Sequence, residues 1–238
     1  MRRSNNPIAA CAVAATVLAA CTAEAPSPAW ARTAPSLYAA GSDVAAPRPG
    51  VLLLHASPGS ERILTRVGSR TEFGSPTRLA VVGESGDWLA VISSKLGNRT
   101  RGFVLRSDIR LTHVPFSVEL DLSRRRLTVW RIGVSVRRID VAIGTPSTPT
   151  PLGRFSVTDK LRVTSDDSPY GCCVLALNGH QTNLPEDWPG GDRLAVHATA
   201  DVDSIGEPVS LGCMRVRSRE AKWLIETIPL GAPIFIRP

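Results

Sequence analysis

Short runs of hydrophobic residues, each bounded by turn-forming residues, are the main pattern between Val51 and Leu111. The runs are four or five residues long, and Gly, Ser, Asp and Asn stand between them. Runs of this length and spacing are typical of the strands of a small β-barrel. The runs are Val51–Leu54, Arg78–Val82, Trp88–Ile92 and Gly102–Leu105.

A second group of strands is predicted after a junction at His113-Val114-Pro115. Hydrophobic and polar residues alternate in two segments joined by a short turn, which predicts a hairpin. A third strand, a proline-rich loop that returns into a strand, and a last strand at the end of the chain complete the pattern. These segments are 118–122 and 126–130 for the hairpin, 138–143 for the third strand, 144–155 for the loop and 233–237 for the last strand.

One segment has the periodicity of an amphipathic helix, from Arg219 to about Ile228, with Ser218 as its N-cap. Its apolar stripe consists of Ala221, Leu224, Ile225 and Ile228. The chain is therefore expected to be mainly β. A small β-barrel module over residues 51–112 precedes a β-rich domain over residues 115–238, which carries one C-terminal helix.

The first fifty residues predict export and anchoring. Residues 1–20 combine an early pair of arginines, a short apolar run and small residues, as in a secretory signal peptide. The segment Leu18-Ala19-Ala20-Cys21 resembles the lipobox of bacterial lipoproteins, whose cysteine is acylated. Residues 21–50 are rich in Ala, Pro and Ser and predict a tether that holds the protein at the membrane, facing the cell wall. In the alternative, the signal peptide is an ordinary one and Cys21 is incidental.

The net charge of +7 comes from arginine in particular, since all but three of the 28 basic residues are arginine. An exported basic protein meets anionic wall polymers and lipid headgroups. No basic helix or aromatic stacking motif predicts nucleic-acid binding. The four histidines lack the spacing of metal ligands, so neither a metal nor another cofactor is expected. The oligomeric state is not predicted.

Two short segments carry the candidate chemistry, one around His197 and one around Cys213. A thiol that attacks an acyl carbon requires a base within hydrogen-bond reach and donors that face the developing oxyanion. His197 fits the base and Cys213 the nucleophile. Gly212 lets the backbone approach a substrate closely, and the amides of Gly212, Cys213 and Met214 are candidate oxyanion donors. Without its flanking motif, a cysteine such as Cys213 is more often a small buried hydrophobic residue than a nucleophile.

The second domain resembles the L,D-transpeptidase family, in which a His-Gly-Thr-like segment precedes a Ser-His-Gly-Cys segment by a similar interval. Four segments carry the resemblance in the family's order, namely Gly144–Phe155, Tyr170-Gly171, Gly190–His197 and Ser210–Val216. The pattern around Gly83–Val91 and Arg101–Val104 also resembles bacterial Src-homology-3-like modules, either as a structural spacer or as a ligand-binding unit. The expected architecture is therefore a small β-barrel followed by an L,D-transpeptidase catalytic domain.

The resemblance implies a peptidoglycan L,D-transpeptidase whose partners are peptidoglycan stem peptides. The Cys213 thiolate would attack the carbonyl of the third residue of a tetrapeptide stem and release D-alanine. The thioester would then pass to an amine of a second stem, or to water in a carboxypeptidase reaction. The Ala198 carbonyl would hold the imidazole tautomer of His197. β-Lactams of the carbapenem class should acylate Cys213.

Four further residues are candidates for substrate binding: Arg215, Ser210, Tyr170 and His180. Arg215 would steer a carboxylate, or is simply a structural arginine. Ser210 most simply supports the turn before Cys213. His180 borders the site in one interpretation and is a loop histidine without function in the other.

Two positions depart from the family pattern. Leu211 stands where the family usually has histidine, and Ala198 replaces the glycine after His197. Leucine cannot donate a hydrogen bond, so slowed or altered catalysis is expected. The competing hypothesis is a noncatalytic lipoprotein that binds the wall. Papain-like hydrolysis is disfavoured because the cysteine follows the histidine.

Cys172 and Cys173 are adjacent, and with Cys213 they leave an odd number of thiols once Cys21 is acylated. The adjacent pair could close on itself, or one of the two could pair elsewhere. The sequence leaves both arrangements open.

Overall fold

The computed structural model describes residues 41–165 and 168–238. The predicted signal peptide, the lipobox with Cys21 and most of the tether therefore lie outside the described residues. Over the described ranges, no helix has the length and apolar character required to cross a membrane.

The first sheet has seven strands in the order β3-β2-β6-β5-β4-β1-β7. Its interior is a compact apolar cluster that includes Leu54, Leu89 and Val104, so the expected hydrophobic runs supply its core. The sheet contains β1 (Ser42–Pro47), β2 (Leu52–His55), β3 (Ile63–Val67), β4 (Leu79–Ser85), β5 (Trp88–Val91), β6 (Gly102–Leu105) and β7 (Ile109–Val114), with a 3₁₀ helix at Arg106–Asp108.

Strand β1 differs from the sequence-based expectation, which placed residues 42–47 in the tether. These residues pair in an antiparallel manner with both β4 and β7, and Val44 and Ala45 are fully buried. The segment has small side chains and no regular alternation, so its pattern resembles a linker. Its conformation is set by the two strands on either side, which are distant in the sequence.

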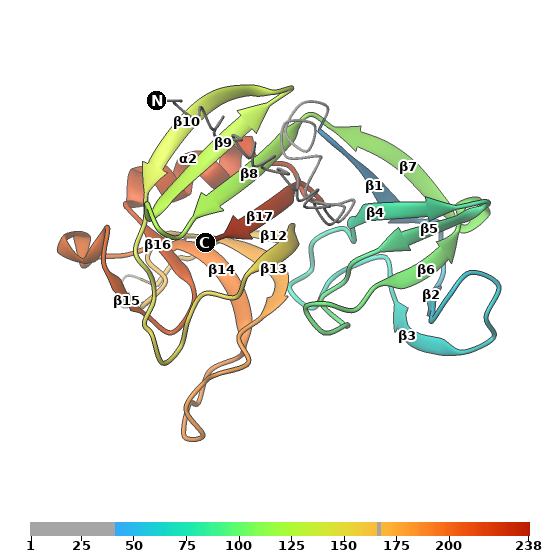
Figure 1. The fold of residues 1–238 in the computed structure, drawn as a ribbon, viewed down its shortest axis with the longest axis horizontal. Helices are drawn as coiled ribbons and strands as arrows, with labels where there is room; N and C mark the ends of the chain where they lie inside the picture. The colour runs from blue at the N-terminus through green and yellow to red at the C-terminus, as the bar shows by residue number, and fades with distance from the viewer. Residues whose placement is uncertain (1–40, 166–167) are drawn as a thin grey trace, which may run out of the picture. The chain divides into compact units, whose positions relative to one another are not determined.

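The second sheet has eight strands in the order β10-β9-β8-β17-β12-β13-β14-β16. Most pairs are antiparallel, whereas β8 with β17 and β14 with β16 are parallel (Figure 1). Its strands are β8 (Phe116–Asp121), β9 (Arg126–Arg131), β10 (Val134–Asp140), β12 (Gly153–Arg162), β13 (Cys173–His180), β14 (Arg193–Ala198), β16 (Met214–Val216) and β17 (Pro233–Arg237). Beside it, β11 (Ile143–Gly144) and β15 (Pro208–Ser210) form a short parallel pair, and Val202–Ser204 is a 3₁₀ helix.

The fold is mainly β, as predicted, and α2 (Ser218–Thr227) is the one α-helix within the part of the chain that the structure describes. The apolar stripe expected for it is buried in the main core. Ser218 is the first helical residue rather than the N-cap, and Arg217 at the cap position makes no side-chain capping bond. The Ile228 amide bonds the carbonyl of Leu224 at the other end, before Pro229.

The two faces of β13 and β14 have different surroundings. Cys173, Leu175 and Leu177 of β13 belong to the main core, together with the residues of α2. Val174 and Ala176 point to the other face and form a small cluster with Ala195 and Cys213. Because side chains alternate along a strand, the helix covers one face and leaves the other to the candidate site.

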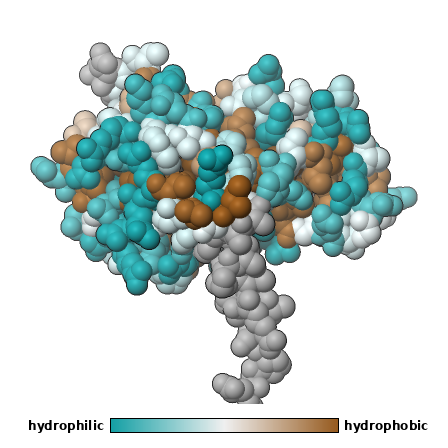
Figure 2. Space-filling view, turned by 90° about the horizontal axis from the view of Figure 1, so that it is seen from above, coloured by the Kyte–Doolittle hydropathy of each residue, from teal (hydrophilic) through white to brown (hydrophobic). Residues whose placement is uncertain are grey.

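The hairpin of β9 and β10 exposes apolar side chains at the open edge of the second sheet. Ile132, Val134 and Val136 are 62, 64 and 45% exposed. The hairpin lies at the top of Figure 1, and the view from that side shows hydrophobic groups interspersed with hydrophilic ones (Figure 2). Arg137 and Arg138 lie on the same edge strand, and charged side chains at such an edge oppose pairing with another chain.

Candidate active site

The segments that carry His197 and Cys213 lie side by side because β14 and β16 are parallel neighbours. Val196 pairs with Met214 and His197 with Arg215, so Cys213 directly precedes β16 at this edge. Val196 and Met214 point into the main core. By alternation, His197 and Cys213 point to the opposite face, where both line one pocket.

This pocket of about 100 Å³ brings together most of the residues expected at the site. Tyr170, Ser210 and Arg215 line it along with the thiol and the imidazole. Leu211 lines it too, so an apolar side chain occupies part of the wall. Residues that no sequence motif singled out also contribute to the wall, namely Gln181, Leu184 and Trp188, together with Arg193 from the Gly190–His197 segment.

His197 is almost fully buried, and its surroundings define its tautomer. Its Nδ1 lies 2.7 Å from the carbonyl oxygen of Ala198, which can only accept, so Nδ1 donates and Nε2 is left as an acceptor. The ring of Tyr170 packs edge-on against the imidazole, with centroids 5.1 Å apart. Burial lowers the pKa of His197 and the Arg215 charge lowers it further, against the opposing bond to Ala198. The imidazole is therefore neutral at neutral pH.

Cys213 is a free, half-buried thiol. Its Sγ–H donates to the carbonyl oxygen of Arg193, with 3.7 Å between sulfur and oxygen. Burial raises the pKa of the Cys213 thiol, and the Ala195 backbone and the Arg215 charge oppose this rise without cancelling it. The resting site thus holds a neutral thiol and a neutral imidazole, and the thiol must lose its proton as it reacts.

The turn before Cys213 is held by Ser210 and by a tightly packed glycine. The Ser210 hydroxyl donates to the Cys213 carbonyl at 2.6 Å and accepts from the Gly212 amide at 3.0 Å. Gly212 has a φ of +112°, and a Cβ added to it would lie 2.1 Å from Nε2 of Gln181. Of the expected oxyanion donors, the Gly212 amide is thus already bonded within the turn, which is a correction to the sequence-based expectation. The Met214 side chain lies in the main core.

Gln181 is the main site residue that the sequence analysis missed. Its Nε2 donates to the carbonyls of Thr148, Pro149 and Leu211 at 3.2, 3.0 and 3.0 Å. The side chain is buried, and it joins the proline-rich loop to the turn that carries Cys213. No pattern in the sequence marks it, because all three partners are backbone groups from distant segments.

The proline-rich loop also braces the thiol turn through two threonine hydroxyls. Thr148 donates to the carbonyl of Ser210 at 3.0 Å, and Thr150 donates to the carbonyl of Gly212 at 2.9 Å. A Cβ at Gly144 would lie 2.2 Å from the Thr148 carbonyl, so the loop turns too tightly there for a side chain. The rigid loop expected from the prolines therefore has a specific role, which is to support the turn before Cys213.

His180 does not line the pocket, in contrast to one interpretation of the sequence. It ends β13, where its Nε2 lies 2.8 Å from the Ser94 carbonyl and its Nδ1 lies 3.0 Å from Asp192. Both ring nitrogens are thus already engaged, one by the Ser94 carbonyl and the other by the Asp192 carboxylate. His180 therefore cannot replace the histidine that is missing before Gly212.

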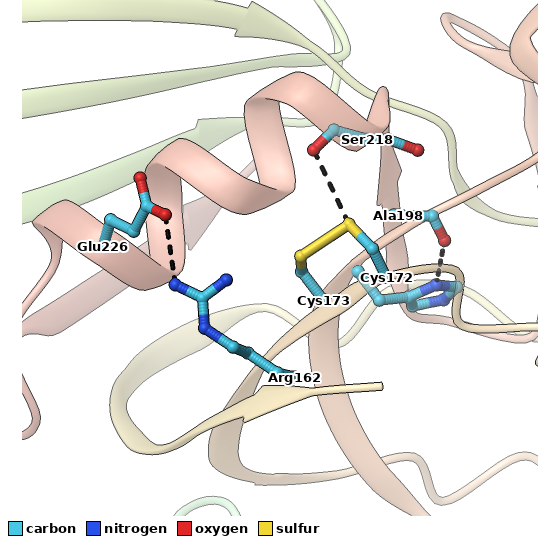
Figure 3. Close-up of a disulfide and its surroundings, with 7 residues drawn as sticks. Arg162, Cys172, Cys173, Ala198, Ser218 and Glu226 are labelled. Atoms are coloured by element: carbon cyan, nitrogen blue, oxygen red, sulfur yellow. Dashed lines mark hydrogen bonds and ion pairs between the residues drawn. A yellow bond between two sulfur atoms is a disulfide. The ribbon is translucent and has the colours of Figure 1, made fainter. Parts of the chain in front are cut away.

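Cys172 and Cys173 are bonded to each other, which decides between the two arrangements that the sequence left open (Figure 3). The Cys172 sulfur lies 3.8 Å from the carbonyl oxygen of Ser218, at the start of α2. Gly171, directly before the pair, has a φ of +60° and packs so closely on Ala198 that an added Cβ would lie 2.6 Å from the Cβ of that residue. The disulfide thus lies next to the backbone that holds His197.

The structure places a free cysteine and a histidine in one pocket of a β-rich domain, and comparison with known proteins identifies the family. Residues 115–236 match the YkuD family, the L,D-transpeptidase catalytic domain, and the chain belongs to this family. The resemblance of the second domain to the L,D-transpeptidase family is therefore confirmed.

Two relatives and one solved structure illustrate the match. The YkuD protein of Bacillus licheniformis is 26% identical over 125 residues, which cover 52% of this chain and 67% of the relative. L,D-transpeptidase 1 of Mycobacterium tuberculosis is 30% identical over 122 residues, which cover 48% of this chain and 47% of the relative, so the match spans about half the length of that protein. The structure of an L,D-transpeptidase in complex with imipenem aligns with 80% of this chain and 100% of its own, at 20% identity and a TM-score of 0.46.

Proposed function

We propose that this protein is a peptidoglycan L,D-transpeptidase that uses Cys213 as nucleophile and His197 as general base. The observation that carries the proposal is the fixed tautomer of His197, because the Ala198 carbonyl occupies Nδ1 and leaves Nε2 to accept a proton. A free thiol lines the same pocket on the same face of the sheet. Membership of the family supports the choice of stem peptides as substrates.

In the first step, the sulfur of Cys213 forms a bond to the carbonyl carbon of the third residue of a tetrapeptide stem. The thiol proton moves to Nε2 of His197 as the S–C bond forms. The tetrahedral intermediate then collapses, the C–N bond to the terminal D-alanine breaks, and His197 returns the proton to the departing amine. The product is a thioester on Cys213, and no oxidant or cofactor takes part.

In the second step, an amine of a neighbouring stem attacks the thioester carbon. His197 accepts a proton from this amine, the C–S bond breaks, and the sulfur regains a proton. The new amide links the third residues of two stems. When water attacks in place of the amine, the product is a trimmed tripeptide stem.

The remaining site residues have proposed roles that follow from their positions. The Cys213 and Met214 amides are the candidate donors to the oxyanion, since the Gly212 amide is bonded to Ser210. Arg215 supplies positive charge beside the thiol and suits the terminal carboxylate of a stem. Tyr170 packs against the imidazole and limits its rotation.

The cellular setting is proposed from the sequence. A signal peptide over residues 1–20, acylation of Cys21 and the tether that follows would place the catalytic domain between the membrane and the wall. The first sheet would be a Src-homology-3-like module.

The rival function is a noncatalytic domain that binds wall polymer, and Leu211 is the observation that favours it. This side chain lines the pocket at a position where a polar group would stabilise developing charge. The two functions differ in one measurable property, which is whether Cys213 forms an acyl bond.

The test is intact-protein mass spectrometry after exposure to a carbapenem such as imipenem. We expect a single covalent adduct on the wild-type chain, no adduct on Cys213→Ala and a strongly slowed reaction on His197→Gln. Turnover of a tetrapeptide stem, measured as release of D-alanine, should be fastest for the wild type, strongly slowed for His197→Gln and absent for Cys213→Ala. An unmodified wild type that binds isolated wall material as well as Cys213→Ala does would establish the noncatalytic function instead.

A further inference from the structure

The loop over residues 181–192 joins β13 to β14 and extends away from the sheet (Figure 1). Gln181, Leu184 and Trp188 from this loop line the pocket that holds Cys213. The two residues at its base, His180 and Arg193, are partners across β13 and β14. Whatever holds these two residues therefore determines where this wall of the pocket stands.

The first base residue, His180, is held by a loop of the first sheet that follows β5. The side chain of Asn98 accepts from the His180 amide and donates to the His180 carbonyl, both at 2.7 Å. This pair of bonds is what the backbone of a neighbouring strand would provide. The Ser94 carbonyl binds the His180 ring from the same loop.

The second base residue, Arg193, is held by a different loop of the first sheet, between β3 and β4. Its guanidinium forms an ion pair with Glu72 and lies 5.8 Å from the ring centre of Phe73. It also bonds Thr158 and the Leu177 carbonyl, at 2.8 and 2.9 Å. Burial lowers the pKa of Arg193 to about 10, so the buried cation depends on these partners.

Arg193 connects this contact directly to the nucleophile. Its side chain binds Glu72 of the first sheet, while its carbonyl oxygen accepts the hydrogen bond of the Cys213 thiol. A displacement of Arg193 therefore changes both the loop wall and the acceptor of the thiol.

We propose that the first sheet helps to form the active site. Asn98 and Glu72 are positioning residues that hold His180 and Arg193, the two residues at the base of the loop over 181–192. We call these two sets of contacts the clamp. This inference rests on the proposed function for its effect on catalysis. The module then acts by fixing the pocket wall and the Arg193 carbonyl, whether or not it binds a ligand of its own.

The clamp has a physical reason. An exposed loop of this length is ordered only if its ends are fixed, because backbone ordering costs about 1–2 kcal/mol per residue. The pairing of β13 with β14 is itself irregular between Ala176 and His180, and beyond it the Gln181 amide donates to the Asp192 carbonyl at 2.7 Å. Polar contacts from the first sheet add to the restraint that this backbone bond provides.

The experiment uses the full chain with the variants Asn98→Ala and Glu72→Gln, and Glu84→Gln as the matched control. Glu84 forms an exposed ion pair with Arg106 elsewhere on the first sheet, so its variant removes the same charge without touching the clamp. Amide hydrogen exchange of residues 181–192 is measured by mass spectrometry, with circular dichroism to verify folding. We expect exchange about tenfold faster in the two clamp variants and unchanged in the control.

Carbapenem acylation supplies the functional readout. For Asn98→Ala and Glu72→Gln, we expect the half-saturating carbapenem concentration to rise about fivefold or more, with a smaller fall in the limiting rate. Glu72→Asp, which keeps the carboxylate, should recover part of the loss. Clamp variants that match Glu84→Gln in both exchange and acylation would overturn the inference. A wild type without any adduct would refute the proposed function alone, since the exchange measurement still tests the clamp.

Discussion

The imidazole of His197 is bound to the carbonyl oxygen of the next residue, Ala198, with 2.7 Å between Nδ1 and oxygen. A carbonyl cannot donate, so this contact fixes which nitrogen carries the proton. It requires no particular side chain at position 198, and the alanine found in place of the family's glycine leaves it intact. Burial then keeps the ring neutral by lowering its pKa.

The pH dependence of acylation follows from these two pKa directions. His197 must be neutral to accept the thiol proton, and its pKa is below the ordinary 6.5, so the rate should rise with pH and reach half its maximum below pH 6.5. The thiol pKa is raised above the ordinary 9.0, so no second rise should appear before that pH. Carbapenem acylation rates measured from about pH 5 to about pH 9 test the profile. A half-maximum above neutral pH would contradict the assigned tautomer and burial.

Gly212→Ala should abolish acylation, because the added Cβ would collide with Gln181 and the positive φ would be strained. The expected loss of stability is about 1–3 kcal/mol, measured by denaturant unfolding. Gly206→Ala is the matched control, since Gly206 also has a positive φ but nothing lies within 4 Å of its added Cβ. Equal acylation by the two variants would show that the Gln181 contact does not shape the site.

Leu211→His should speed acylation by about tenfold or more, because a polar side chain returns to a pocket wall that faces the developing charge. Leu184→His is the control, since Leu184 lines the same pocket from the loop over 181–192. Limiting rates of carbapenem acylation provide the comparison. If neither histidine changes the rate, Leu211 is not what limits this site.

The double variant Cys172→Ala/Cys173→Ala should slow acylation by about threefold to tenfold, since the disulfide holds the turn that places Tyr170 against His197. Its melting temperature should fall little, because a bond between neighbours in sequence closes almost no loop in the unfolded chain. Treatment of the wild type with a thiol reductant should have the same effect on the rate. An unchanged rate in both cases would mean that the turn keeps its position without the bond.

The elements that were predicted correctly are those determined by the residue pattern within the element itself. The hairpin of β8 and β9, the strand β17 and the helix α2 lie where alternation and helical periodicity predicted them. The thiol and imidazole segments were found because residue type and order carry the family pattern. Strand β1 was missed because its conformation is determined by pairing with β4 and β7.

The supporting residues of the site were missed for a related reason. Gln181 bonds three backbone carbonyls, and Asn98 bonds the backbone of His180. Because every residue type offers the same backbone groups, neither contact can be recognised from the sequence pattern. Glu72 meets Arg193 only because two sheets come together. Such partners are set by tertiary packing, which a single sequence does not reveal.

The positions of Cys173 at the start of β13, of its neighbour Cys172 and of Cys213 directly before β16 affect how long the Cys213 thiol stays free. Cys173 points into the main core, whereas Cys213 lies on the opposite face of the same sheet. Within the part of the chain that the structure describes, the sheet thereby separates the Cys213 thiol from the bonded pair, which blocks disulfide exchange between them inside one folded molecule. Oxidation of Cys213 by the described cysteine pair would therefore require a second molecule, so its rate should rise with protein concentration, as it should with the concentration of a small oxidant.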